Sequence, residues 1–241
     1  MGQRLVFPLR RLGHLSREEF QAYWFDHHAP LVASVADTLG IVGYQQVHTR
    51  FEARSTTVPC FDGVAELWFD PAARAGDRDA VAAASQLLLD DERTFIDLPA
   101  SPLWMAEEDV HLAGPTEGLR MTAVLRRHPS ITRDEFRRHW SKVHGPWALR
   151  HPEVFGFRHY TQLHTPADAD DSPIARARQA PPAFDGVSVI HRDPPTASAE
   201  AVAALRAEFH EDEQSFLDVD ASPVFFGEVR VILGEQEGAR R

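Results

Sequence analysis

The sequence predicts an α+β fold in which two copies of a βαββαβ unit pack their antiparallel sheets face to face. Three observations predict this fold: an internal repeat, the alternation of strand and helix patterns within each copy, and the bare sheet face that each copy would expose. The repeat aligns "SREEFQAYWFDHHAP" (16–30) with "TRDEFRRHWSKVHGP" (132–146), a shift of 116 residues. Matches in the same order follow between "FDGVAELWFD" and "FDGVSVIHRD" and between "DDERTFIDLPASP" and "EDEQSFLDVDASP". These ordered matches indicate a duplication, with one copy at 1–115 and the other at 116–241.

Each copy begins with a strand and a capped helix. In the first copy the strand is expected at 4–10, where Pro8 favours an edge or a bulge because proline cannot donate to a ladder. Ser16 and Glu19 then have the spacing of a capping box, which marks the start of a helix. Aromatic residues at helical spacing predict its buried face. These aromatic residues are Phe20 and Trp24 in the first copy and Phe136 and Trp140 in the second, where Thr132 and Glu135 form the capping box.

Two strands, a second helix and a final strand complete each copy. They are expected at 43–49, 63–69, 80–89 and 103–112 in the first copy, and at 159–165, 186–191, 199–209 and 224–233 in the second. The order strand, helix, strand, strand, helix, strand is that of a ferredoxin-like unit. The second copy also carries a seven-residue insertion in "TPADADDSPIARARQAPPA", whose composition is typical of a flexible surface loop.

The bare face of each sheet predicts how the copies pack. Both helices of a ferredoxin-like unit cover one face of its sheet, so the other face needs a cover of its own. The second copy is the obvious cover, and two facing sheets would enclose a barrel-like interior around a pseudo-two-fold axis.

One strand in each copy has an unusually polar face. Side chains alternate along a strand, so Tyr44, Gln46 and His48 share a face in "GYQQVHT". Beneath the helices, each unpaired polar group would cost about 1–3 kcal/mol. We therefore expect this face to point into the barrel, where its groups can meet water, each other or a ligand. The second copy repeats the pattern at Tyr160, Gln162 and His164.

Composition excludes several classes of partner. The formal net charge of −11 argues against a nucleic-acid backbone or an anionic membrane surface. No apolar run approaches the roughly 18 residues needed to span a bilayer. Cys60 is the only cysteine, so an intrachain disulfide is excluded, and no signal-peptide pattern is found at the N-terminus. We expect a cytoplasmic protein.

Two histidines are the first candidates for chemistry. His28 and His144 each stand in a His-small-Pro sequence at an expected helix bend. Proline would disrupt the helix there and aim the histidine towards the sheet edge, and histidine suits proton transfer near neutral pH. The alternative is that each histidine only caps a helix end through a backbone carbonyl.

The polar strand face supplies a second candidate set. Tyr44 could donate a hydrogen bond to an enolate oxygen while His48 takes a proton from the adjacent carbon, and Tyr160 with His164 could do the same. The alternative is a buried hydrogen-bond ladder that fixes strand register. Gln46 and Gln162 are expected to orient their neighbours, and together with Trp24, Trp68 and Trp140 they are the expected substrate contacts.

Glu66 distinguishes the two copies, because the second has Val189 at that place. A carboxylate beside Trp68 in a shared cavity would have a raised pKa and could act as an acid or base. The alternative is that Glu66 pairs with one of the repeated arginines, Arg4 or Arg120. If one copy has kept the chemistry, Glu66 favours the first.

Several of these segments resemble a known family. "EEFQAYWFDHHAPL", "YQQVH", "FDGVAELWFD" and "DDERTFID" followed by "SP" are similar to the EthD family of the dimeric α+β barrel superfamily, and the second copy repeats most of them. The resemblance implies an intrachain dimeric α+β barrel, in which one chain corresponds to a fused dimer. It also points to His28 as the histidine of the family's HxPL motif. Members of the superfamily include cofactor-free cyclases, dehydratases and isomerases, small monooxygenases and haem enzymes.

The functional expectation is a cofactor-independent lyase or isomerase that uses no metal. Its substrate would be a carbonyl-bearing hydrophobic small molecule, such as a polyketide or aromatic intermediate. One alternative is a non-catalytic binding or accessory protein of an oxygenase system, and another is a haem or oxygen-dependent oxidoreductase. The sequence leaves open whether the fused pseudo-dimer forms a homodimer.

Overall fold

In the computed structural model, which describes residues 3–54, 56–74 and 76–234, eight antiparallel strands form one closed barrel. They are β1 (Gln3–Leu9), β2 (Ile41–Glu52), β3 (Gly63–Phe69), β4 (Trp104–Leu112), β5 (Arg120–Leu125), β6 (Phe157–His164), β7 (Gly186–Arg192) and β8 (Val224–Leu233). Their order around the barrel is β1-β3-β2-β8-β5-β7-β6-β4. Each half of the chain therefore contributes four adjacent strands, and the halves join where β2 pairs with β8 and β4 pairs with β6.

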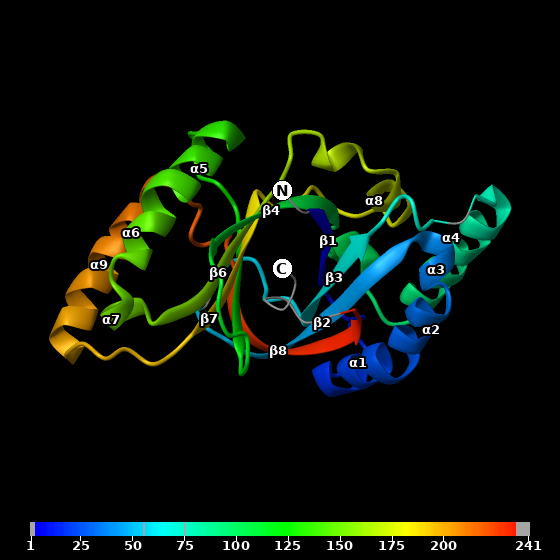
Figure 1. The fold of residues 1–241 in the computed structure, drawn as a ribbon, viewed down its shortest axis with the longest axis horizontal. Helices are drawn as coiled ribbons and strands as arrows, with labels where there is room; N and C mark the ends of the chain where they lie inside the picture. The colour runs from blue at the N-terminus through cyan, green and yellow to red at the C-terminus, as the bar shows by residue number, and fades with distance from the viewer. Residues whose placement is uncertain (1–2, 55, 75, 235–241) are drawn as a thin grey trace.

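Helices cover the outside of the barrel on two opposite sides (Figure 1). Those of the first half are α1 (Arg17–Tyr23), the π-helical turn η1 (Trp24–His28), α2 (Ala29–Ser34), α3 (Ala36–Leu39), α4 (Arg78–Glu92) and the short η2 (Leu98–Ala100). Those of the second half are α5 (Arg133–His139), the π-helical turn η3 (Trp140–His144), α6 (Gly145–Leu149), α7 (Pro152–Phe155), η4 (Ala169–Asp171), α8 (Pro173–Ala177) and α9 (Ala199–Phe216). The fold is thus a mixed α+β fold with a closed antiparallel barrel, as predicted. The outermost residues of the two predicted copies, 1–2 and 235–241, lie outside the described part of the chain.

The starts of α1 and α5 agree with the sequence. Ser16 and Thr132 each accept a hydrogen bond from the backbone at the third helical residue, and Glu19 and Glu135 return the bond, so both capping boxes are confirmed. Pro30 lies in the first turn of α2, where the missing N–H is tolerated, and the bend before it is the π-helical turn.

The interior of the barrel is packed with side chains from both halves. Its apolar core includes Val6, Val47 and Val64 from the first half, and Val124, Leu163, Val187, Val189 and Phe225 from the second. Gly63 lets Trp24 lie close to the sheet on the opposite face, because a Cβ there would come within 2.5 Å of the indole. Burying this apolar surface stabilises the barrel by roughly 25 cal/mol per Å² removed from water.

A buried ionic group lies within this apolar core. The carboxylate of Glu66 contacts Arg4 Nη1 at 3.1 Å and Arg120 Nη2 at 2.6 Å, and the side chains of all three residues are fully buried. Arg4 also contacts Glu108 at 3.0 Å. The alternative that Glu66 pairs with a repeated arginine is therefore confirmed, and it pairs with both.

The polar face of β2 does not point into the barrel, so that prediction is wrong. Val47 pairs with Val64 and faces the interior, so strand alternation turns Tyr44, Gln46 and His48 towards the helices of their own half. The second half follows the same pattern, with Leu163 inside the barrel and Tyr160 against Trp140. Burial beneath the helices is tolerated because these polar groups are paired with each other.

The insertion of the second half crosses to the first half. It contains α8, which lies beside the helices of the first half in Figure 1. Arg178, just after α8, forms a two-point ion pair with Glu92 of α4, with N–O distances of 2.6 and 2.7 Å. The insertion is therefore part of the wall of the first half, which its composition did not indicate.

No helix within the described residues has both the length and the apolar character needed to cross a membrane.

Replacing Glu66 with valine, the residue that the second half has at this place, should lower the free energy of unfolding by about 3–5 kcal/mol. The reason is that two buried guanidinium groups would lose their shared counter-charge. Urea unfolding measures the change. The matched control is Glu228→Gln, which removes an exposed ion pair with Arg50 and should cost less than about 1 kcal/mol. Equal losses for the two variants would contradict this assignment.

Candidate functional site

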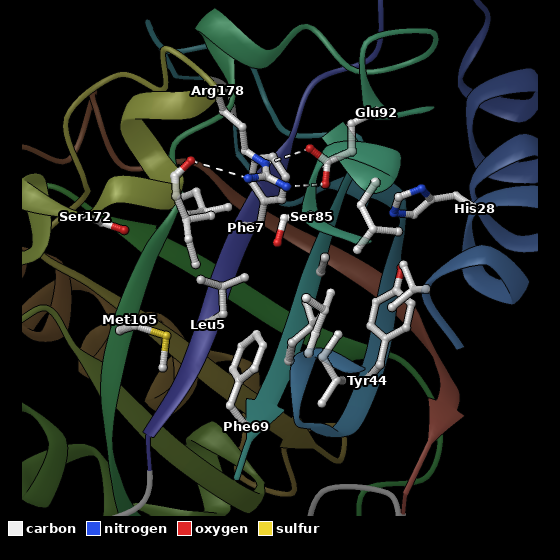
Figure 2. Close-up of a pocket in the computed structure, with 18 of the residues that line it drawn as sticks. Leu5, Phe7, His28, Tyr44, Phe69, Ser85, Glu92, Met105, Ser172 and Arg178 are labelled. Carbon is white, nitrogen blue, oxygen red and sulfur yellow. Dashed lines mark hydrogen bonds and ion pairs between the residues drawn. The ribbon is translucent and has the colours of Figure 1, made fainter. Parts of the chain in front are cut away.

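A cavity of about 600 Å³ lies between the first sheet and the helices of the first half (Figure 2). Its floor is the helix-facing side of the sheet, and Arg178 and its neighbours in the insertion close one end. Most of its lining is apolar, with Leu5, Phe7, Leu9, Ile41, Leu67, Phe69, Leu88 and Met105 among the contributing side chains. Such a lining fits a hydrophobic small molecule.

Polar groups in this cavity include His28, Tyr44, Glu92 and Arg178 (Figure 2). In the close-up, Arg178 lies over Phe7 beside Glu92, and His28 points inward from the helices. The guanidinium carbon of Arg178 is 6.0 Å from the centre of the Phe7 ring. The cavity therefore combines a long apolar surface with a few placed polar groups.

His28 forms a dyad with Asp91 of α4. Its Nδ1 lies 2.7 Å from Asp91 Oδ2, and the Tyr23 hydroxyl donates to Oδ1 of the same carboxylate at 2.7 Å. The hydrogen bond from His28, followed by that from Tyr23, lowers the pKa of Asp91, so the carboxylate stays ionised at neutral pH. Nδ1 is then the protonated nitrogen and Nε2 is the basic one. His28 is thus held by a carboxylate, and although it is the N-cap residue of α2, its side chain makes no capping hydrogen bond.

Tyr44 is held by a hydrogen-bonded ladder that starts at Trp24. Trp24 Nε1 donates to the Tyr44 oxygen at 2.9 Å, and Gln46 Nε2 donates to the same oxygen at 2.7 Å. Gln46 also donates to the Trp24 carbonyl at 3.0 Å, and its own oxygen lies 2.8 Å from His48 Nε2. Because the phenol oxygen accepts hydrogen bonds from Trp24 and Gln46, its own hydrogen points away from these two donors. Tyr44 also lines the cavity. Burial raises the pKa of Tyr44, which keeps that hydrogen in place.

His48 and Gln46 belong to the ladder and not to the cavity wall. The ring of His48 stacks on Trp24 with centroids 4.8 Å apart and an interplanar angle of 13°. Burial, with a smaller effect of Arg230 and Arg50, lowers the pKa of His48 to about 3. His48 is therefore neutral at physiological pH, and the alternative of a buried ladder describes its contacts.

The second half has a smaller cavity of about 340 Å³ at the corresponding place. Trp140, His144 and Tyr160 line it. His144 Nδ1 contacts Asp212 at 2.7 Å, and His139 takes the place of Tyr23 on the same carboxylate at 2.9 Å. The dyad is therefore present in both halves.

Two substitutions restrict the second site. Phe209 replaces Leu88, and its ring centroid lies 4.1 Å from that of His144. Ser188 replaces Ala65, and it partly opposes the effect of burial, which raises the pKa of the Tyr160 hydroxyl. The second dyad is thus more enclosed, and its phenol lies near a polar side chain where the first half has alanine.

The ladder of the second half is shorter. Gln162 donates to Tyr160 at 2.6 Å, but among the described residues no bond joins Gln162 to His164. His164 Nε2 instead lies 3.9 Å from Asp109 Oδ2, and burial lowers the pKa of His164 to about 4. Like His48, His164 does not line the cavity of its half.

Glu66 and Trp68 lie inside the barrel, away from both cavities. Trp68 Nε1 donates to Glu108 at 2.8 Å, and the Arg4 guanidinium carbon is 5.0 Å from the centre of the Trp68 ring. The prediction that imidazoles and phenols line a chamber inside the barrel is therefore wrong. The interior instead holds the apolar core and the buried ionic group of Arg4, Glu66 and Arg120. Of the residues singled out from the sequence, six line the two cavities: Trp24, His28 and Tyr44 line the first, and Trp140, His144 and Tyr160 line the second.

Sequence reasoning missed the partners of these residues. Asp91 and Asp212 occupy equivalent places in the repeated "DDERTFID" and "EDEQSFLD" segments, so the repeat itself carried a signal for them. Glu92 is likewise matched by Glu213, but Arg178 lies in the insertion and carried no such signal, so their contact could not be inferred. Within the described residues, no group of three or more His, Cys, Asp or Glu side chains is arranged to hold a metal ion.

The buried histidine of the ladder predicts how stability depends on pH. His48 has a folded pKa of about 3 and an unfolded pKa near 6.5, so below about pH 6.5 the unfolded state takes up a proton that the folded state does not. The free energy of unfolding should therefore fall as pH drops from about 6.5, by up to about 1.4 kcal/mol per pH unit from this residue.

The variant His48→Gln keeps an N–H donor but cannot titrate. Urea unfolding measures how much the free energy of unfolding falls between about pH 7 and about pH 5. This decrease should be about 1–2 kcal/mol smaller in His48→Gln than in the wild type. The exposed His14→Gln is the control and should keep the wild-type loss. An unchanged loss in His48→Gln would contradict the ladder geometry.

Comparisons with known proteins agree with the repeat. The family model described as the EthD domain matches residues 13–99 and again 128–220. A search of curated proteins found no significant match.

Three solved structures align with nearly the whole chain at low sequence identity. A proposed monooxygenase from Lactobacillus acidophilus NCFM is 8% identical, with 96% of each chain covered and a TM-score of 0.46. A proposed chlorite dismutase is 12% identical, with 95% of this chain and 94% of that chain covered and a TM-score of 0.47. A proposed monooxygenase from Fusobacterium nucleatum is 9% identical, covering 98% of this chain and 95% of that one, with a TM-score of 0.48. Because the family model matches both halves and most of the sequence, this chain belongs to the EthD family and carries two EthD domains in tandem.

Proposed function

We propose that the first half binds a carbonyl-bearing hydrophobic small molecule and moves protons on it without a cofactor, as a lyase or isomerase. One observation carries the proposal: His28, which is hydrogen-bonded to Asp91, and Tyr44 line the same largely apolar cavity. A base and a hydrogen-bond donor in one apolar site are the groups that enolate chemistry requires.

The dyad would supply the base. Asp91 holds the proton on Nδ1, so Nε2 of His28 can take a proton from the carbon next to a substrate carbonyl. The electron pair of the broken C–H bond then forms the carbon–carbon double bond of an enolate. Asp91 stabilises the imidazolium that results, as a buried carboxylate does for histidine in other dyads.

Tyr44 would stabilise the enolate oxygen. Its hydroxyl is positioned by Trp24 and Gln46, and its raised pKa keeps it protonated as a donor. The imidazolium of His28 could return the proton to a different carbon, which gives isomerisation. It could alternatively protonate a β-hydroxyl group that leaves as water, which gives dehydration. Both outcomes balance without an oxidant or reductant.

The first half suits this role better than the second. Its cavity is about 600 Å³ against about 340 Å³, and Leu88 leaves more room beside the dyad than Phe209 does. Ala65 also places an apolar side chain where the second half has the polar Ser188 near Tyr160. The apolar lining supports a polyketide or aromatic intermediate as the substrate class.

The proposal includes the organisation of the chain. The adjacent strands β4-β1-β3-β2 and β8-β5-β7-β6 support two ferredoxin-like βαββαβ repeats. We place their boundary between 115 and 116, in the segment that joins β4 to β5.

Hydrogen exchange on a simple ketone tests the proposal without the natural substrate. The protein should accelerate exchange of the α-hydrogens of β-tetralone, a bicyclic ketone, in deuterated buffer, as followed by NMR. His28→Gln should reduce the rate by about 10²–10⁴-fold because it removes the base. Tyr44→Phe should reduce it by about 10²-fold because it removes the donor to the enolate oxygen.

The second half provides matched controls, since His144→Gln and Tyr160→Phe make the same changes in the other cavity. These variants should keep the exchange rate of the wild type, with thermal unfolding used to confirm that all four proteins fold. A wild-type rate in His28→Gln would contradict the proposal and would favour a binding or accessory role. A visible absorption spectrum of the purified protein tests the haem alternative independently.

A further inference from the structure

Two arginines of the second half line the smaller cavity together. Arg192 ends β7 and is half-buried, whereas Arg206 lies on α9 and is exposed. At the equivalent places the first half has Phe69 and Ser85. The arginine pair is thus a property of the second cavity alone.

The charges that line the two cavities differ. The first cavity has Arg74 and Arg178 together with Asp70 and Glu92, so its formal charges balance. The second cavity is lined by the charged residues Arg54, Arg192, Arg206 and Glu213. An excess of positive charge therefore surrounds the second cavity, although the whole chain has a net charge of −11.

Glu213, the one carboxylate among the described residues that line the second cavity, already has a partner. Arg54 reaches Glu213 from the other half of the chain, with an N–O distance of 3.5 Å. Within the part of the chain that the structure describes, neither Arg192 nor Arg206 forms an ion pair with a carboxylate. The two guanidinium groups are consequently uncompensated.

Two like charges at one cavity favour an anion between them. Burial first, and then the charge of Arg206, lowers the pKa of Arg192. A carboxylate would relieve this repulsion, and the planar fork of a guanidinium matches both oxygens of such a group.

The remaining wall of the cavity is aromatic. Phe155, Phe157 and Phe209 line it where the first half has the aliphatic residues Leu39, Ile41 and Leu88. Together with Trp140 they give flat apolar surfaces around a volume of about 340 Å³. This wall suits a planar ring system that is smaller than the ligand of the first cavity.

We infer that the second cavity binds a small aromatic carboxylate, with its ring system against the phenylalanines and its carboxylate at Arg192 and Arg206. This site is separate from the proposed catalytic cavity and does not depend on the reaction proposed there. The duplication would therefore have produced one cavity for an uncharged hydrophobic molecule and a second cavity for an anion.

Isothermal titration calorimetry with 2-naphthoate and 2-naphthamide tests the inference, because the two probes share a ring system and differ in charge. Naphthoate should bind at least about tenfold more tightly than naphthamide, which is the scale of a hydrogen bond to a charged group. The double variant Arg192→Phe, Arg206→Ser gives the second cavity the residues of the first. It should lose this preference while its affinity for naphthamide is unchanged.

A charge-matched control separates a specific site from general attraction. The double variant Arg138→Ser, Arg150→Ser removes two exposed arginines from the same half and should keep the preference for naphthoate. Because Arg206 is exposed, the single variant Arg206→Ser is expected to fold and should weaken naphthoate binding on its own. Equal affinities of the wild type for the two probes would overturn the inference. So would a preference that survives in the Arg192→Phe, Arg206→Ser variant.

Discussion

The closure of the barrel decides which face of each strand meets the helices, and both cavities depend on that choice. Val6, Val47 and Val64 fill the interior, so the neighbouring residues along the same strands must face outward. The buried group of Arg4, Glu66 and Arg120 joins the two halves at this interior. The outward faces then carry the phenols beneath the helices, where His28 and His144, held by carboxylates of α4 and α9, line the same cavities.

The two halves share the hydrogen-bonded groups of the site but differ in the other side chains that line each cavity. Both halves retain the His–Asp dyad and a tyrosine held by glutamine, because these groups satisfy each other in a buried place. The walls differ at positions that only touch the cavity, such as Leu88 against Phe209 and Phe69 against Arg192. Each cavity is also closed by a segment of the opposite half, through Arg178 in one case and Arg54 in the other. The two sites can therefore differ in ligand while the barrel stays the same.

Local patterns predicted the elements, and pairing over long distances in the sequence determined the site. The repeat, both capping boxes and the pairing of Glu66 with an arginine could be inferred from residue types and spacing. The direction in which Tyr44 points could not be inferred. An unpaired polar group beneath a helix is costly, but Trp24, Tyr44, Gln46 and His48 form hydrogen bonds with one another and so avoid that cost. The contact between Arg178 and Glu92 had no local signal either, since it depends on where an insertion crosses in three dimensions.

Crystallography with a bromine-labelled bicyclic ketone shows most directly which part of the molecule binds the substrate. The anomalous signal of the bromine locates the compound without assumptions about its pose. We expect the signal in the first cavity, among Phe7, His28 and Tyr44, beneath the helices of the first half. A signal inside the barrel, among Val64 and Glu66, would contradict this account.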